Sequence, residues 1–208
     1  MRSMSVVSAV ALAAAALMVA PDAIAQRNRN QAATVLVVNY QRVVAETALG
    51  RDMAAKLQQL RTQFGAEAQA LVPEQQSLEQ ERTRLNQARR NLTDDQVRNS
   101  ATLAPQFQQF QQRLQQLEAR AQTLRGDLEC TQGLALRDFD RQASPVVRSI
   151  MEARGAGMVI DAGNAQQVLP QFDVTNTVIQ QLDQNPATRT ANVARHAMAE
   201  CQAPAAAQ

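Results

Sequence analysis

Few side chains in this sequence have the types and spacing that catalysis or metal binding requires. His196 is the only histidine among the 208 residues, and Cys201 follows it closely. Two ligands do not complete a zinc site. Asp94 and Asp95 are neighbouring carboxylates, but they follow Thr93 at the predicted start of a helix, where acidic groups offset the helix dipole. The sequence therefore predicts neither a metal centre nor a catalytic carboxylate pair.

Other features typical of enzymes are also missing from the sequence. It contains no glycine-rich phosphate loop and no serine or cysteine nucleophile with a histidine near it in the sequence. We therefore predict that the protein is not an enzyme and needs no cofactor. The net charge is only +2, and basic and acidic residues are mixed along the chain. This pattern is typical of a solvated surface, so we expect no nucleic-acid partner.

A group of arginines gathers near residue 90, where a helical turn is expected. Such side chains could capture acidic polypeptide segments or an anionic lipid surface. The alternative is an ordinary solvated helix face, partly neutralised by Glu81, Asp94 and Asp95. The candidate binding residues are Arg82, Arg84, Arg89, Arg90 and Arg98.

The elements that would position these residues follow from a seven-residue repeat of apolar side chains. A strict repeat of this length marks the seam of a coiled coil. The repeat runs along one segment, breaks near residue 92 and resumes, which predicts a long antiparallel helical hairpin. Its members are Leu57, Phe64, Leu71, Leu78, Leu85 and Leu92, and then Leu103, Phe110, Leu117 and Leu124, interleaved with Phe107, Leu114, Ala121 and Leu128.

Prolines divide the predicted hairpin. We expect a first helix over residues 51–90 that begins after a break at Gly50, with a kink at Pro73. The tip is expected at residues 91–93, and Thr93 with Gln96 predicts a capping box at the start of the returning helix. Pro105 predicts a second kink, so both prolines are candidate hinges of the arm.

The two ends of the chain differ from this helical centre. Residues 1–25 have the charged start, apolar stretch and small-residue cleavage site of a secretory signal peptide, with cleavage near Ala25. The apolar stretch is short for a membrane span. Export would place Cys130 and Cys201 in an oxidising compartment. An intrachain disulfide, an intermolecular disulfide and two free thiols all remain open.

Short strands flank the hairpin. Residues 34–39 read as a buried strand and residues 40–46 as a short helix. Residues 158–161 and 167–169 read as two further strands, and Asp173 can cap a final helix over residues 174–182. Three short strands are too few to be stable alone, so we expect several chains to pool them. The predicted oligomer core is Leu36, Val37, Val38, Val159 and Ile160.

The predicted fold is therefore mainly α, with a long antiparallel coiled-coil hairpin inserted between strands of a small oligomeric β body. Residues 26–50 form the first part of this body and residues 51–153 the arm. Residues 154–182 form the second part with the final helix, and residues 183–208 a flexible tail.

Two segments resemble the Skp/OmpH family of periplasmic chaperones. Residues 38–50 look like the family's VN-x-x-RV-x-x-E-x-x-x-G signature, and residues 173–182 look like its final D-[IL]-T-x-x-V-[IL]-x-x-L helix. The resemblance implies a periplasmic trimer in which helical arms surround a cavity. Unfolded outer-membrane proteins would be held there without ATP.

Two functions therefore compete. A holdase chaperone would use kinked, yielding arms to shield clients through many weak contacts. A structural spacer of the cell envelope would use the same coiled coil as a rod. The prolines and the charged seam positions Glu67, Glu74 and Glu81 disfavour the rod.

Overall fold

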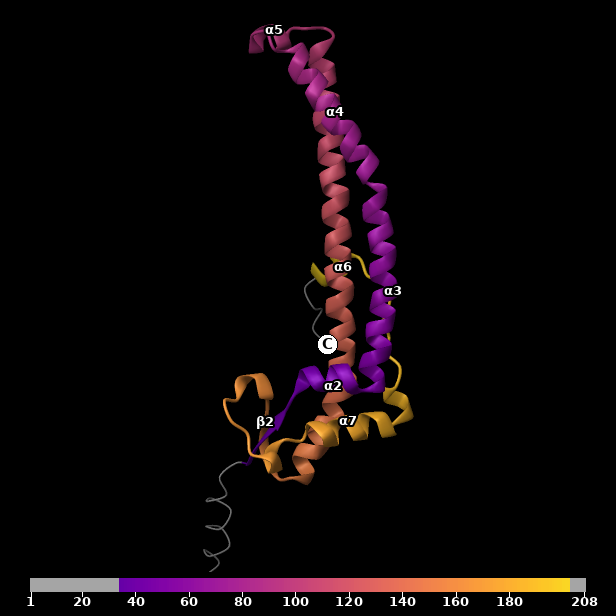
Figure 1. Cartoon of the computed structure of the whole chain (residues 1–208), viewed down its shortest axis with the longest axis vertical. Coiled ribbons are helices and arrows are strands. Elements are labelled where there is room, and N and C mark those ends of the chain that lie inside the picture. The colour runs from indigo at the N-terminus through magenta and orange to yellow at the C-terminus, as the bar shows by residue number, and fades with distance from the viewer. Residues whose placement is uncertain (1–33, 203–208) are drawn as a thin grey trace, which may run out of the picture.

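The computed structural model describes residues 34–202 as a small base from which a long helical arm extends (Figure 1). The predicted signal peptide, residues 1–25, lies outside the described residues. The helices are α2 (Tyr40–Glu46), α3 (Ala48–Ala70), α4 (Val72–Ala88), α5 (Asp94–Arg98), α6 (Leu103–Ala153), α7 (Thr175–Gln184) and α8 (Met198–Gln202). The strands are β1 (Thr34–Val38) and β2 (Ala156–Asp161), and short 3-10 turns cover Ala162–Asn164, Pro170–Phe172 and Pro186–Thr188. The prediction of a mainly helical chain with a small sheet is confirmed.

The sheet consists of β1 and β2, which pair in parallel. The whole arm is the crossover between them, as a parallel pair requires. The predicted third strand at 167–169 is wrong. Instead of a third strand, a single backbone hydrogen bond reaches the free edge of β1: the Val174 N–H donates to the Val37 carbonyl over 2.9 Å. Leu169 is 60% exposed and is followed by Pro170, which has no N–H to offer a ladder.

The hydrophobic core lies where the sheet, α7 and the lower ends of α3 and α6 meet. Phe139 of α6 is fully buried there and meets the Tyr40 ring edge-on, with centroids 5.7 Å apart. Leu36 and Val38 point into this core from β1, and Val178 and Leu182 point into it from α7. The core therefore joins segments from both ends of the chain.

The two signature segments bond directly to each other in this base. Asn39 caps α2 by accepting from the Arg42 N–H, and its own N–H donates to Thr175 Oγ1 over 2.8 Å. Asp173 in turn accepts from the Thr175 N–H over 2.9 Å. Asp173 is not the cap of α7, contrary to prediction: Val174 holds the N-cap position, and the helix start has no side-chain cap hydrogen bond. The polar residues of both signatures thus fasten the start of α7 to the end of β1.

The predicted break at Gly50 is wrong. Gly50 lies in the first turn of α3, which Thr47 caps by accepting from the Gly50 N–H. A Cβ at this position would lie 1.7 Å from the Val44 carbonyl oxygen. The glycine is therefore required because α2 passes very close to the start of α3.

Candidate functional site

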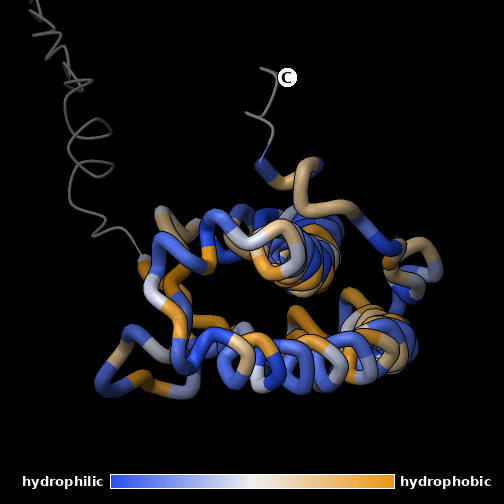
Figure 2. The backbone as a smooth tube through the Cα atoms, turned by 90° about the horizontal axis from the view of Figure 1, so that it is seen from above, coloured by the Kyte–Doolittle hydropathy of each residue, from blue (hydrophilic) through white to orange (hydrophobic). Residues whose placement is uncertain are grey.

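The arm consists of α3 and α4, which run outward, and α6, which runs back beside them (Figure 1). The 51 residues of α6 correspond to about 75 Å at about 1.5 Å per residue. The outgoing half of the predicted seam is mostly enclosed: Leu57, Phe64, Leu78 and Leu85 are buried, and Leu71 is half-buried. On the returning half, Leu117 is buried and the other seam residues are half-buried. Leu92 is 40% exposed because the chain has already turned away at that point. Seen from above, hydrophilic residues make up much of the tube of the arm (Figure 2).

Charged pairs cross the seam at regular intervals. Glu81 accepts from Arg113 over 2.6 Å, and Glu74 accepts from Arg120 over 3.1 Å. The two glutamates are seven residues apart on α4, and their arginine partners are seven residues apart on α6 in the opposite direction. This is the spacing that an antiparallel register requires. Glu74 and Glu81 therefore have charged partners across the seam, so their charge does not argue against a rigid, rod-like arm. The next position in this register places Glu67 opposite Asp127, which are two acids.

The outgoing helix is interrupted at Leu71, between α3 and α4, and changes direction there (Figure 1). Pro73 lies at the start of α4, where its missing N–H ends the hydrogen-bond ladder of α3. Two cavities of about 410 and 420 Å³ flank this break, and Leu71 and Leu124 line both of them. Side chains thus leave open space beside the interruption.

Pro105 does not kink α6, contrary to prediction. The segment from Asp94 forms the separate helix α5, so α6 begins only at Leu103 and Pro105 falls in its first turn. A proline there replaces an N–H that would have no intrahelical partner. Pro145, which was not singled out from the sequence, lies inside α6, close to the base. A proline inside a helix removes one backbone bond, and that signal was available in the sequence.

We expect Pro73→Ala to merge α3 and α4 into one straighter helix and to raise the free energy of unfolding by about 1–3 kcal/mol. Pro105→Ala is the matched control, because it removes a proline that breaks no bond. Small-angle scattering and urea unfolding would compare both variants with the parent. Equal arm shape and equal stability in all three proteins would contradict a hinge at Pro73.

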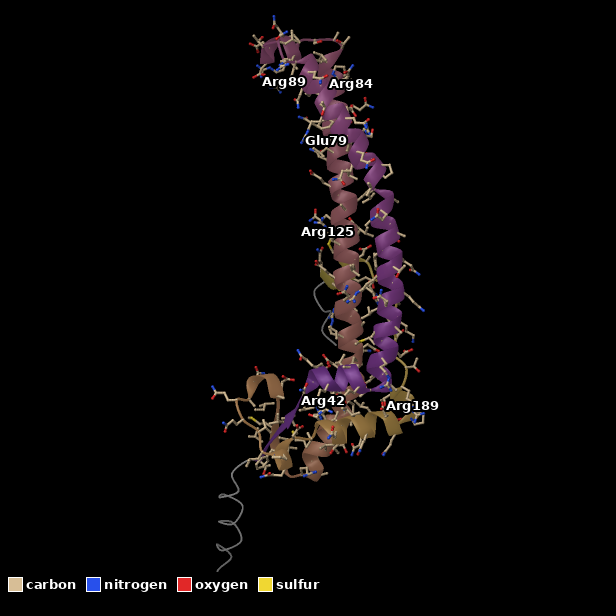
Figure 3. All side chains as sticks on the ribbon, in the orientation of Figure 1. Arg42, Glu79, Arg84, Arg89, Arg125 and Arg189 are labelled. Carbon is tan, nitrogen blue, oxygen red and sulfur yellow. A yellow bond between two sulfur atoms is a disulfide. The ribbon has the colours of Figure 1, made fainter. Side chains whose placement is uncertain are left out.

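The far end of the arm carries the predicted arginines. Figure 3 shows Arg84 and Arg89 there. The predicted capping box is confirmed: the Thr93 N–H donates to Gln96 Oε1 over 2.8 Å, and the Gln96 N–H donates back to Thr93 Oγ1 over 3.3 Å. The candidate arginines differ in their partners. Arg82 pairs with Glu79, Arg98 with Asp95 and Arg89 loosely with Asp94, whereas Arg84 and Arg90 have no ion pair among residues 34–202.

The segment predicted as a flexible tail is docked on the arm as far as residue 202. Residues 189–202, which we call the strap, run from the end of α7 up along α3 and α6 (Figure 1). Ala191 is buried in the main core cluster. Cys201 forms a disulfide with Cys130 of α6, which resolves the three open states of the cysteines. It also excludes Cys201 as a metal ligand beside His196. Among residues 34–202, no three potential metal ligands converge.

The strap supplies the cation that the two opposed acids of the seam lack. Arg195 pairs with both Glu67 and Asp127, with one nitrogen 3.0 Å from Glu67 Oε2 and 3.6 Å from Asp127 Oδ2. Its guanidinium also lies 4.5 Å from the centre of the Phe64 ring. The hydrogen bond from Arg195 holds the pKa of the Glu67 carboxyl below its usual value. Sequence reasoning missed this site because nothing in the repeat indicates that a distant arginine completes it.

The residues predicted as an oligomer core lie on two different faces of the sheet. Leu36, Val38 and Val159 face the core of their own chain. Val37 and Ile160, which are paired across β1 and β2, line an apolar groove of about 580 Å³ on the opposite face. The exposed apolar residues around this outer face were missed by the sequence analysis. They are Val35, Met158 and Leu169.

No helix within residues 34–202 has both the length and the apolar run that a membrane span requires. No curated protein matches the sequence. One solved structure, from Caulobacter crescentus and assigned as an OmpH-like outer membrane chaperone, shares 20% identity with a TM-score of 0.54. The match covers 79% of this chain and 91% of that one, and it supports the fold. The family model described as outer membrane protein (OmpH-like) matches residues 34–182, from the first residue of β1 to Leu182 within α7. The chain therefore belongs to the OmpH-like family.

Proposed function

We propose that this protein is an ATP-independent holdase chaperone of the periplasm that binds unfolded outer-membrane proteins. One observation carries the proposal: a long arm, interrupted at Leu71 and flanked there by two cavities, extends from a base that contains the core. Such an arm offers reach and a surface that adapts to clients of different shape. Membership of the OmpH-like family and the similarity to the Caulobacter crescentus structure also support a chaperone function.

The direct test uses the mature full-length protein and an outer-membrane β-barrel protein diluted from urea. We expect roughly equimolar chaperone oligomer to suppress the rise in light scattering without any nucleotide. A spacer of the cell envelope would leave aggregation unchanged, so unchanged scattering would contradict the holdase and favour the spacer.

The proposal includes a homo-oligomer, in the simplest case a trimer, assembled through the outer face of the sheet. A two-stranded sheet is marginal alone, and the exposed side chains of Val35 and Met158 lie in register on that face. Several arms projecting from one assembled base would then surround a space for the client. This arrangement places the arm as an insertion between strands of a shared β body.

We expect Val35→Asp and Met158→Asp to dissociate the oligomer while each chain stays folded. Both side chains are exposed in the single chain, so an aspartate costs little there, but it would be buried without a partner in an assembled base. Leu136→Asp is the control, because the exposed fraction of Leu136 lies between those of Val35 and Met158 but the residue lies on α6. Light scattering gives the mass and circular dichroism the fold. Parent-like mass for both variants would place the interface elsewhere.

We also propose that the arginines of the far end attract anionic groups, either acidic client segments or a lipid surface. Each basic residue near an anionic membrane contributes about 1 kcal/mol. Arg84→Glu with Arg90→Glu should therefore weaken binding to phosphatidylglycerol vesicles by about tenfold or more at low salt. Arg61→Glu with Arg125→Glu makes the same charge change lower on the arm, at two exposed positions. Equal binding by the two variants would assign no special role to the far end.

A further inference from the structure

The strap lies in a groove between α3 and α6 that holds its backbone through side chains of both helices. From α3, Asp52 accepts from the Ala191 N–H and Lys56 donates to the Ala191 carbonyl, each over 2.8 Å. From α6, Thr131 Oγ1 accepts from the His196 N–H over 3.0 Å, and Asp127 accepts from the Met198 N–H over 2.8 Å. Residues 189–197 belong to no helix or strand. These bonds recognise an extended backbone, which every polypeptide has.

The same groove has places for two side chains of its occupant. Met198 packs against Gly126, where a Cβ would lie 2.3 Å from the methionine sulfur. The absence of a side chain at Gly126 therefore leaves room for an apolar group. Arg195 lies over the Phe64 ring and between Glu67 and Asp127. Without a cation there, the two acids would face each other across the seam, so the groove favours an occupant with a basic residue.

We propose that this groove is a binding site for extended segments of unfolded polypeptide that carry an arginine or lysine, and that the strap with its disulfide keeps the site closed. The strap is then a surrogate client supplied by the chain itself. The inference rests on the proposed holdase function and gives it a specific site on the lower arm. A tethered segment competes at a high effective concentration, which the Cys130–Cys201 bond raises further.

The first measurement asks whether the disulfide closes the groove. In the full-length Cys130→Ser, Cys201→Ser variant, we expect the N–H groups of Ala191, His196 and Met198 to exchange with solvent at least about tenfold faster than in the parent. A labelled peptide with the sequence of residues 188–199 should bind this variant about tenfold more tightly than the disulfide-bonded chain. Unchanged exchange, or no peptide binding by a variant whose strap is released, would overturn the proposal.

The second measurement asks whether the groove recognises backbone and a cation. In the same double-serine background, Thr131→Val keeps the side-chain shape but removes a backbone bond, so it should weaken peptide binding about fivefold. Thr123→Val is its control, since Thr123 is exposed on the same helix and makes no hydrogen bond with the strap. A peptide with glutamate in place of Arg195 should bind about tenfold more weakly. Equal effects of the two valine variants, or equal binding of the two peptides, would overturn the site.

The third measurement separates a client site from a simple brace. A peptide of unrelated sequence, with an arginine three residues before a methionine, should also bind the double-serine variant and lose affinity with Thr131→Val. Binding of the strap sequence alone would show that the groove serves only its own tail. The parent is tested beside it in the aggregation assay. Suppression of aggregation by the parent, together with no peptide binding by the double-serine variant, would overturn this inference and leave the holdase function standing.

Discussion

Removal of the outer arm should strongly weaken the holding of clients and leave the base folded. The variant deletes residues 72–123 and joins Leu71 to Leu124 through a short glycine-serine linker. These two leucines line the same cavities, so a short linker can connect them. The core cluster lies entirely outside the deleted segment, and so do the strap and its disulfide. The lost surface is therefore that of the arm alone.

We expect the shortened protein to unfold cooperatively and to need more than about tenfold higher concentration to suppress aggregation of a β-barrel client. Insertion of the same linker between Asn91 and Leu92 is the control, because it disturbs the far end without removing the arm. Parent-like protection by the shortened protein on a molar basis would show that clients bind to the base or to the lower arm. Circular dichroism and the oligomer mass would verify that the base is intact.

The largest stability effect is expected for Phe139→Ala. The Phe139 ring is completely buried where α6 meets α2 and the sheet, and it packs edge-on against Tyr40. Truncation removes the contacts of a large aromatic side chain and leaves a cavity, at a cost of about 3–5 kcal/mol. Because a domain is stable by only about 5–15 kcal/mol, the variant should be close to unfolding at moderate temperature.

Phe107→Ala is the matched control for this prediction. Phe107 is half-buried in the outer arm, so its loss should cost less than half as much. Urea unfolding of both variants, followed by far-ultraviolet circular dichroism, gives the two free-energy differences. A smaller loss for Phe139→Ala than for Phe107→Ala would show that the stability of the chain resides in the arm rather than in the base.

We expect the strap to limit how the arm can move. It connects α3 and α6 up to Glu67 and Asp127, and the interruption at Leu71 follows only a few residues later. The lower arm thus has three connected segments, whereas the outer arm has the helices alone. We therefore expect bending to be concentrated at the break near Pro73, just beyond the last contact of the strap. Release of the strap would extend the flexible part toward the base.

Local patterns in the sequence were sufficient wherever neighbouring residues decide the structure. The seven-residue repeat predicted which leucines would be enclosed, because a helix places such positions on one face. Thr93 and Gln96 predicted a capping box, because both partners lie within one turn. The β-branched residues after Ala33 predicted β1, and the signature at residues 38–50 predicted the family.

Tertiary structure decided everything that depends on contacts between distant residues. Pro105 was misjudged because a proline kinks a helix only if the helix has already begun, and the start of α6 depends on where α5 ends. The predicted third strand failed because Val174 had already met the edge of β1. The tail was misread because its anchors, Asp52 and Cys130, are far away in sequence. A segment without its own periodicity is ordered by the surface it meets, and a single sequence does not display that surface.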